Sequence, residues 1–125
     1  MQIEVSPGDV IDRLTILEIK LERIADPAKQ AFVTREYTML TGALAAAPPL
    51  PGIEALRAAL KAVNLALWEV EDALRAHEAQ GDFGAGFVEL ARSVYRHNDR
   101  RAGLKQEINA LAGSLLDDVK SYTGY

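Results

Sequence analysis

The chain contains no cysteine and only two histidines among its 125 residues. The lack of cysteine excludes disulfide bonds, thiol catalysis and thiolate metal sites. Two histidines are too few to build a histidine-rich metal site. We therefore expect neither a bound metal ion nor a cofactor.

Aromatic residues and positive charge are also scarce. Aromatic residues make up 6% of the chain, and 14 Lys and Arg stand against 18 Asp and Glu, for a net charge of −4. Proteins that bind nucleic acid usually combine a basic surface with aromatic side chains that stack on bases. The composition therefore argues against a nucleic-acid partner.

Long apolar runs are missing as well. The longest uncharged run, residues 37–53, is interrupted by three prolines and two glycines, which makes it unsuitable for crossing a bilayer. The first residues have neither the basic start nor the apolar stretch of a signal peptide. We expect a cytoplasmic protein without a membrane partner.

Apolar residues recur at the three- and four-residue spacing of helices along most of the chain. Ser6 and Pro7 favour a helix start, and Asp26-Pro27 ends that helix and begins a second one. Residues 48–52 form a linker before a third helix that starts at Ile53. The glycine-rich residues 81–86 form a turn before a fourth helix, 87–112, with a short tail helix after it.

These segments predict one all-α domain that covers residues 1–125. We expect a small antiparallel helical bundle of about four helices. Because the turn between the third and fourth helices is short, those two should form a long hairpin that dominates the fold.

Two polar residues interrupt the apolar stripe of the fourth helix. His97 and Arg101 occupy positions where the helical repeat calls for apolar side chains. In the predicted hairpin, Glu71 of the third helix faces this region. The sequence therefore predicts an interior polar cluster of Glu71, His97, Asn98 and Arg101, with Trp68 beside it.

Three further polar residues complete the candidate pocket: Lys105 and Asn109 on the fourth helix, and Glu18 beside the stripe of the first. Two interpretations remain open at this point. The cluster can be a structural network that fixes the register of the helices. It can also be a pocket for a small anion, with Arg101 donating through its forked guanidinium and His97 serving as donor or acid.

The first helix is apolar on most of its circumference. Ile16 and Ile19 point away from its leucine stripe. Such a helix is either central in the bundle or buries its second face against a partner. We expect both burial within the fold and a homodimer contact through these two residues.

A positive segment lies inside this acidic protein. Residues 87–109 hold five basic and three acidic residues, and Arg92, Arg96 and Arg100 share the outward side of the fourth helix. This stripe is either a solvated helix face or a contact for phosphate or an acidic protein partner.

Catalytic motifs are weak, so the catalytic residues stay unknown. Phosphate-binding glycine loops, Ser/His/Asp arrangements and HExxH are absent. The leading hypothesis is a non-catalytic binding or accessory protein for a small anion or another protein. The alternative is a small helical enzyme acting on a dianionic metabolite. A chorismate-mutase-like bundle would use cations such as Arg101, and a magnesium-dependent nucleotide pyrophosphohydrolase would use the E-x-x-D of residues 69–72.

Several stretches together resemble a bacterial family of small all-helical proteins of unknown function. They are VSPGDVIDRLTILEIKLERI, LWEVED and ELARSVYRHNDRRAGLKQEINAL, with KSY near the end, and the likeness covers nearly the whole chain except residues 43–53. The resemblance implies no catalytic residue. It implies that the family pattern includes Asp12, Thr15, Glu18, Asn98, Asp99, Arg101, Lys105 and Asn109.

Overall fold

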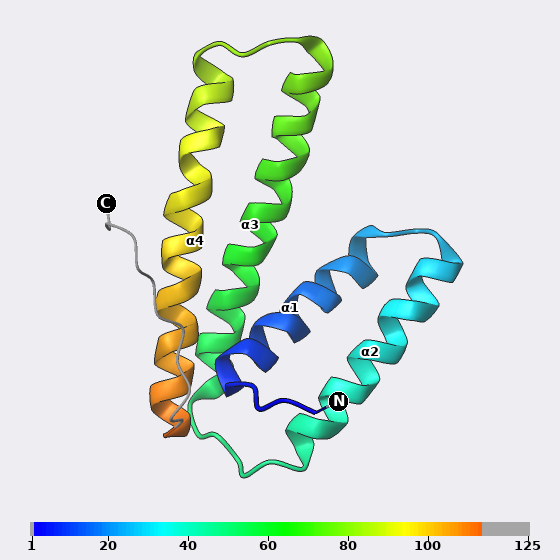
Figure 1. Cartoon of the computed structure of the whole chain (residues 1–125), viewed down its shortest axis with the longest axis vertical. Helices are drawn as coiled ribbons and strands as arrows, with labels where there is room; N and C mark the ends of the chain where they lie inside the picture. Colours follow the sequence, from blue (N-terminus) through cyan, green and yellow to red (C-terminus); the bar gives the residue numbers. More distant parts are fainter. Residues whose placement is uncertain (1, 114–125) are drawn as a thin grey trace.

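The computed structural model describes residues 2–113, which fold into four α-helices without a strand in that range (Figure 1). The helices are α1 (Pro7–Arg23), α2 (Pro27–Ala45), α3 (Ile53–Gln80) and α4 (Ala85–Ala112). The all-α prediction is confirmed. The tail helix predicted after Gly113 lies outside the described residues.

The helix boundaries follow from local capping chemistry. The Ser6 hydroxyl accepts a hydrogen bond from the Asp9 amide at 3.2 Å, and the Asp26 carboxylate accepts one from the Ala28 amide at 3.0 Å. A proline follows each cap at the first helical position. Both caps satisfy amides that have no partner within the helix. The predicted start of α4 at Phe87 is two residues late.

The long hairpin of α3 and α4 dominates the molecule, and α1 packs against its base (Figure 1). The other side of α1 carries α2, so α1 contacts all three other helices. The core brings together six buried residues of α1, α3 and α4: Ile11, Leu14, Leu60, Val63, Leu104 and Ile108. The central position of α1 accounts for its broadly apolar circumference.

The two isoleucines of the predicted dimer contact have different surroundings. Ile19 is 1% exposed, so it lies inside this chain and offers no surface to a partner. Ile16 is half-buried and borders a surface hollow. The homodimer itself stays a prediction, and its contact surface has to consist of residues other than Ile19.

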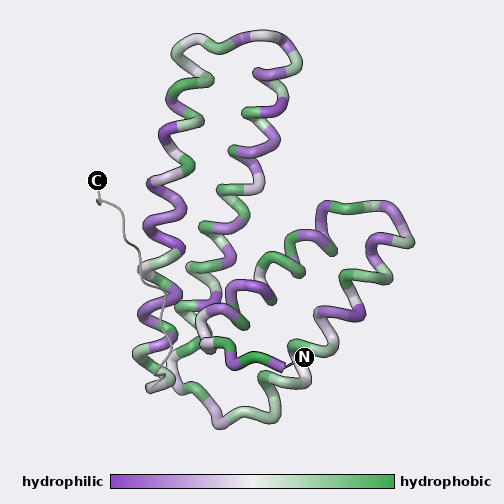
Figure 2. The backbone as a smooth tube through the Cα atoms, in the orientation of Figure 1, coloured by the Kyte–Doolittle hydropathy of each residue, from purple (hydrophilic) through white to green (hydrophobic). Residues whose placement is uncertain are grey.

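Within the hairpin, fully buried residues are confined to its base. No residue between 65 and 103 is buried, whereas the base contributes buried residues from both α3 and α4. We call residues 65–103 the arm. Apolar and polar residues alternate along both of its helices up to the tip (Figure 2).

None of the helices in residues 2–113 combines the length and the low charge content that crossing a membrane requires.

Candidate functional site

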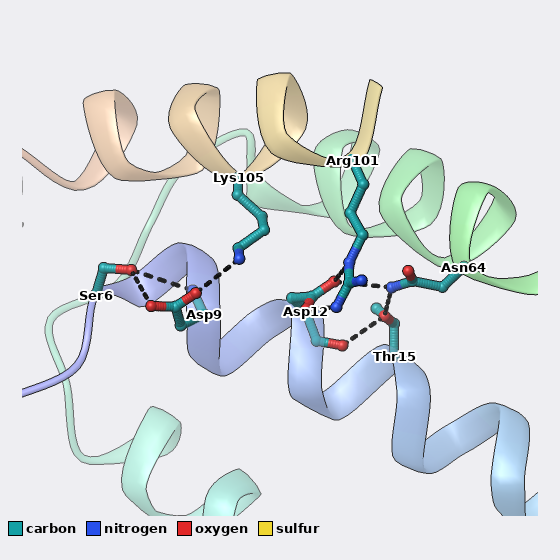
Figure 3. Close-up of polar contacts among 7 residues, drawn as sticks. All are labelled: Ser6, Asp9, Asp12, Thr15, Asn64, Arg101 and Lys105. Atoms are coloured by element: carbon teal, nitrogen blue, oxygen red, sulfur yellow. Dashed lines mark hydrogen bonds and ion pairs between the residues drawn. The ribbon is translucent and has the colours of Figure 1, made fainter. Parts of the chain in front are cut away.

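A buried polar network joins α1 to both helices of the hairpin (Figure 3). The Asp12 carboxylate accepts hydrogen bonds from Arg101 Nε at 2.9 Å, from Arg101 Nη2 and from Asn64 Nδ2 at 2.9 Å. The Thr15 hydroxyl accepts a second bond from Asn64 at 2.8 Å and donates to the Asp12 carbonyl. Asp12, Thr15 and Asn64 are all at most 6% exposed, so each polar group depends on these partners.

A second set of contacts lies one turn nearer the start of α1. Lys105 Nζ lies 2.8 Å from the Asp9 carboxylate, which also accepts a hydrogen bond from the Ser6 hydroxyl. Burial by itself raises the pKa of Asp9, but the hydrogen bond and charge of Lys105, with help from Ser6, bring that pKa below its ordinary value. Asp9 is therefore held in its charged form by α4.

The start of α1 touches the backbone of α4 directly. The Gly8 amide donates a 2.7 Å hydrogen bond to the Asn109 side-chain oxygen. A Cβ at Gly8 would lie 2.6 Å from the Lys105 carbonyl oxygen and 2.8 Å from that Asn109 oxygen. Only glycine therefore permits this approach without displacement of the chain.

The predicted cluster places Glu71 in the interior beside Arg101, and this interior position is wrong. Glu71 is exposed, and the carboxylate on Arg101 comes from Asp12 of α1. The physical reason is that α1 packs across both hairpin helices at this level, so the inward side of α4 faces α1. The prediction considered only α3 as the neighbour of α4.

Glu18, which the sequence placed in the candidate pocket, forms its contacts elsewhere. Its carboxylate accepts hydrogen bonds from Arg57 at 3.0 Å and from Tyr37 at 3.2 Å, and it lies 3.6 Å from Lys61 Nζ. These residues connect α1 with α2 and α3. Glu18 therefore belongs to a separate structural contact and not to the predicted pocket.

A hollow of about 420 Å³ opens where α1 diverges from the hairpin. Trp68, Glu71, Asn98 and Arg101 border it, so the structure brings four of the predicted pocket residues to one place. His97, Lys105, Asn109 and Glu18 do not line this hollow. Its other lining residues are Ile16, Ile19, Asn64, Leu67, Asp72, Arg75 and Val94.

The charges around the hollow do not favour a small anion. Arg101 is bound by Asp12, and Lys105 lies beyond the hollow on Asp9. The remaining cation in the lining, Arg75, is matched there by two acidic residues, Glu71 and Asp72. Excess positive charge, which an anion site needs, is therefore not present among these residues.

The residues of the proposed magnesium motif are not gathered into a ligand set. In the described part of the chain, no three His, Asp or Glu side chains are grouped so that they could hold a metal ion. Glu69 instead forms a 2.9 Å surface ion pair with Arg23 of α1.

The chain belongs to a family of proteins of unknown function. The model of the "Family of unknown function (DUF6165)" matches residues 1–125, the whole chain. Neither the curated proteins nor the solved structures include a significant match.

Proposed function

We propose that this chain is a non-catalytic accessory protein that binds another protein through one face of the arm. This face continues upward from the side of the hairpin that α1 covers at the base. We call it the arm face and define it by Trp68, Glu71 and Arg75 of α3 with Ala91, Val94 and Asn98 of α4.

The observation that carries this proposal is the incomplete burial of the arm. Its apolar stripe continues through Leu67, Leu74, Leu90 and Val94, yet each of these residues is only half-buried. Two helices packed side by side bury only the apolar residues along the line where they touch. An apolar stripe wider than this line needs a third helix or a partner to bury the remainder. At the base α1 supplies this element, and along the arm a partner would supply it.

The composition of the arm face is that of a protein contact. The hollow at its lower end has apolar walls from Ile16, Leu67, Trp68 and Val94 and a charged rim that includes Glu71. Protein interfaces typically combine an apolar centre with a polar rim, and tryptophan is enriched among their most important residues. Trp68 is the only tryptophan in the chain, which also makes it a specific fluorescent reporter of this region.

A photo-crosslinking amino acid at position 91 tests the proposal in the cells that normally make the protein. Ala91 is exposed and lies seven residues before Asn98, on nearly the same side of α4. The control position is Ala62, also exposed, which lies nine residues before Glu71 and thus on the opposite side of α3.

We expect position 91 to crosslink one defined protein, identified by mass spectrometry, and position 62 not to crosslink it. The substitution Trp68→Asp should abolish that crosslink while the helical circular dichroism spectrum is retained. Equal crosslinking from both positions, or none from position 91, contradicts the proposal.

A further inference from the structure

The part of the hairpin that α1 and α2 leave uncovered has a defined length. Asp12 bonds both Asn64 of α3 and Arg101 of α4, which fixes α1 on the hairpin at that level (Figure 3). The end of α1 reaches further along α3, where Arg23 forms a 2.9 Å surface ion pair with Glu69. Beyond Glu69, residues 70–80 of α3 extend about 17 Å. With α4 alongside, this face measures roughly 350 Å² in projection, and the hollow next to it adds the side chains of Leu67 and Trp68 to the area available for a partner, against the roughly 800 Å² per partner of a stable complex.

Two charged residues on this face are complementary to each other. Glu71 and Arg75 lie one helical turn apart and have opposite charges, and the ion pairs among residues 2–113 include neither side chain. If α3 packs antiparallel against a copy of itself about an axis level with residue 73, each Glu71 faces the partner's Arg75. A two-fold axis forms this contact twice.

We propose that the protein bound by the arm face is a second copy of this chain, with the two arms antiparallel about that axis. This inference rests on the proposed function, because it names the partner of the same surface. The two hairpins would then form a four-helix arrangement, with one copy of α1 at each end.

The tip of the arm supports the same register. An axis at residue 73 places residue 82 opposite the partner's Asn64, since both lie nine residues, or about 14 Å, from the axis. The tip would therefore end at the level of the hollow beside the partner's own α1. Phe83 at the tip is 53% exposed and packs edge-to-face on Phe87, with 5.2 Å between the ring centroids. In the proposed dimer these apolar side chains would enter the partner's hollow beside Trp68.

Charge reversal distinguishes this dimer from other forms of association. Sedimentation equilibrium at micromolar concentration should give twice the mass of the chain for the native sequence. Glu71→Arg and Arg75→Glu should each weaken the dimer about tenfold or more, because each creates two like-charge contacts per dimer. The double variant should restore the affinity to within about threefold.

Arg92→Glu is the matched control, because Arg92 is an exposed arginine on the outward side of α4. It should leave the dimer unchanged. A monomeric native chain, or single reversals that behave like this control, would overturn the inference.

Disulfide trapping provides a measurement that does not depend on affinity. The native chain has no cysteine, so each introduced thiol is unique. A mixture of Glu71→Cys and Arg75→Cys chains in a glutathione buffer should form mixed disulfide dimers in preference to either homodimer. Absence of that preference overturns the register.

The two proposals can fail separately. If the native chain is a monomer and position 91 crosslinks a different protein, the arm face still binds a protein and only the second-copy inference is wrong. If a dimer forms but the single reversals match the control and position 91 does not crosslink, both proposals are wrong.

Discussion

Asp12 is the carboxylate that holds α1 on the hairpin, and its removal should destabilise the fold. It is 5% exposed and bonded to both Arg101 and Asn64. Removing one partner of a buried ion pair costs about 3–5 kcal/mol, because the remaining charge stays buried without compensation. We predict that Asp12→Ala and Arg101→Met both destabilise the protein and that Arg101→Met does so more strongly.

The unequal exposure of the two side chains sets the expected magnitudes. The Arg101 side chain is 30% exposed and that of Asp12 only 7%. After Asp12→Ala the guanidinium can reach water in the hollow, so we expect a loss of about 2–3 kcal/mol. After Arg101→Met the carboxylate keeps only its contact with Asn64, so we expect about 3–5 kcal/mol. The double variant should lose at least about 2 kcal/mol less than the sum of the singles.

Urea unfolding followed by circular dichroism measures these free energies. Arg13→Met is the matched control. Arg13 is the neighbouring residue in α1 and pairs with Glu36 at 2.8 Å, but the two side chains are 44% and 27% exposed. Its loss should cost less than about 1 kcal/mol. Equal losses for Arg101→Met and Arg13→Met, or an additive double variant, would refute the reasoning.

Three further predictions concern separate contacts. Gly8→Ala should lower the free energy of unfolding by about 1–3 kcal/mol, because the added Cβ would lie 2.6 Å from a backbone oxygen. The control Gly103→Ala, in open space on α4, should instead stabilise the fold by up to about 1 kcal/mol. Equal effects of the two substitutions would contradict this prediction. The pKa of Asp9 is lower in the folded state than its ordinary value of 3.8, so the charged carboxylate stabilises the fold at pH values above 3.8. This contribution is lost as the pH falls through the lower folded-state pKa. Asp9→Asn should therefore lower the free energy of unfolding at neutral pH, and that free energy should then fall less on acidification than it does in the native chain. The same decrease with falling pH in both proteins would contradict this prediction. Glu18→Gln should destabilise by about 1–2 kcal/mol, because it weakens contacts with two basic side chains of α3, and a change within error of zero in urea would contradict it.

The helices could be predicted because their signals are local. Ser6-Pro7 and Asp26-Pro27 each place a capping side chain directly before a proline, and both helices begin there. The 48–52 linker separates α2 and α3 in the same way. Caps, prolines and apolar spacing act within one or two helical turns. These signals can therefore be recognised in a single sequence without knowledge of which helices are neighbours.

The site was predicted only in part because it depends on which helices are neighbours. The interruption of the α4 stripe correctly marked Arg101 as a residue with unusual surroundings. The carboxylate that binds Arg101 belongs to Asp12, 89 positions away in the chain. The spacing within the hairpin indicated Glu71 instead. The signal that could have indicated the pairing is in α1, where Asp12 and Thr15 interrupt an apolar face one turn apart.

The polar network and the arm face are connected through the position of α1. Asp9 and Asp12 are one turn apart, and so are their partners Lys105 and Arg101 on the antiparallel α4. A slide of α1 by one turn would leave at most one of these two pairs, and the Gly8 contact with α4 would be lost as well. The network therefore fixes α1 at one height on the hairpin, and that height sets how much of the arm remains uncovered. Substitutions in the network should then change both stability and association, whereas substitutions on the arm face should change association alone.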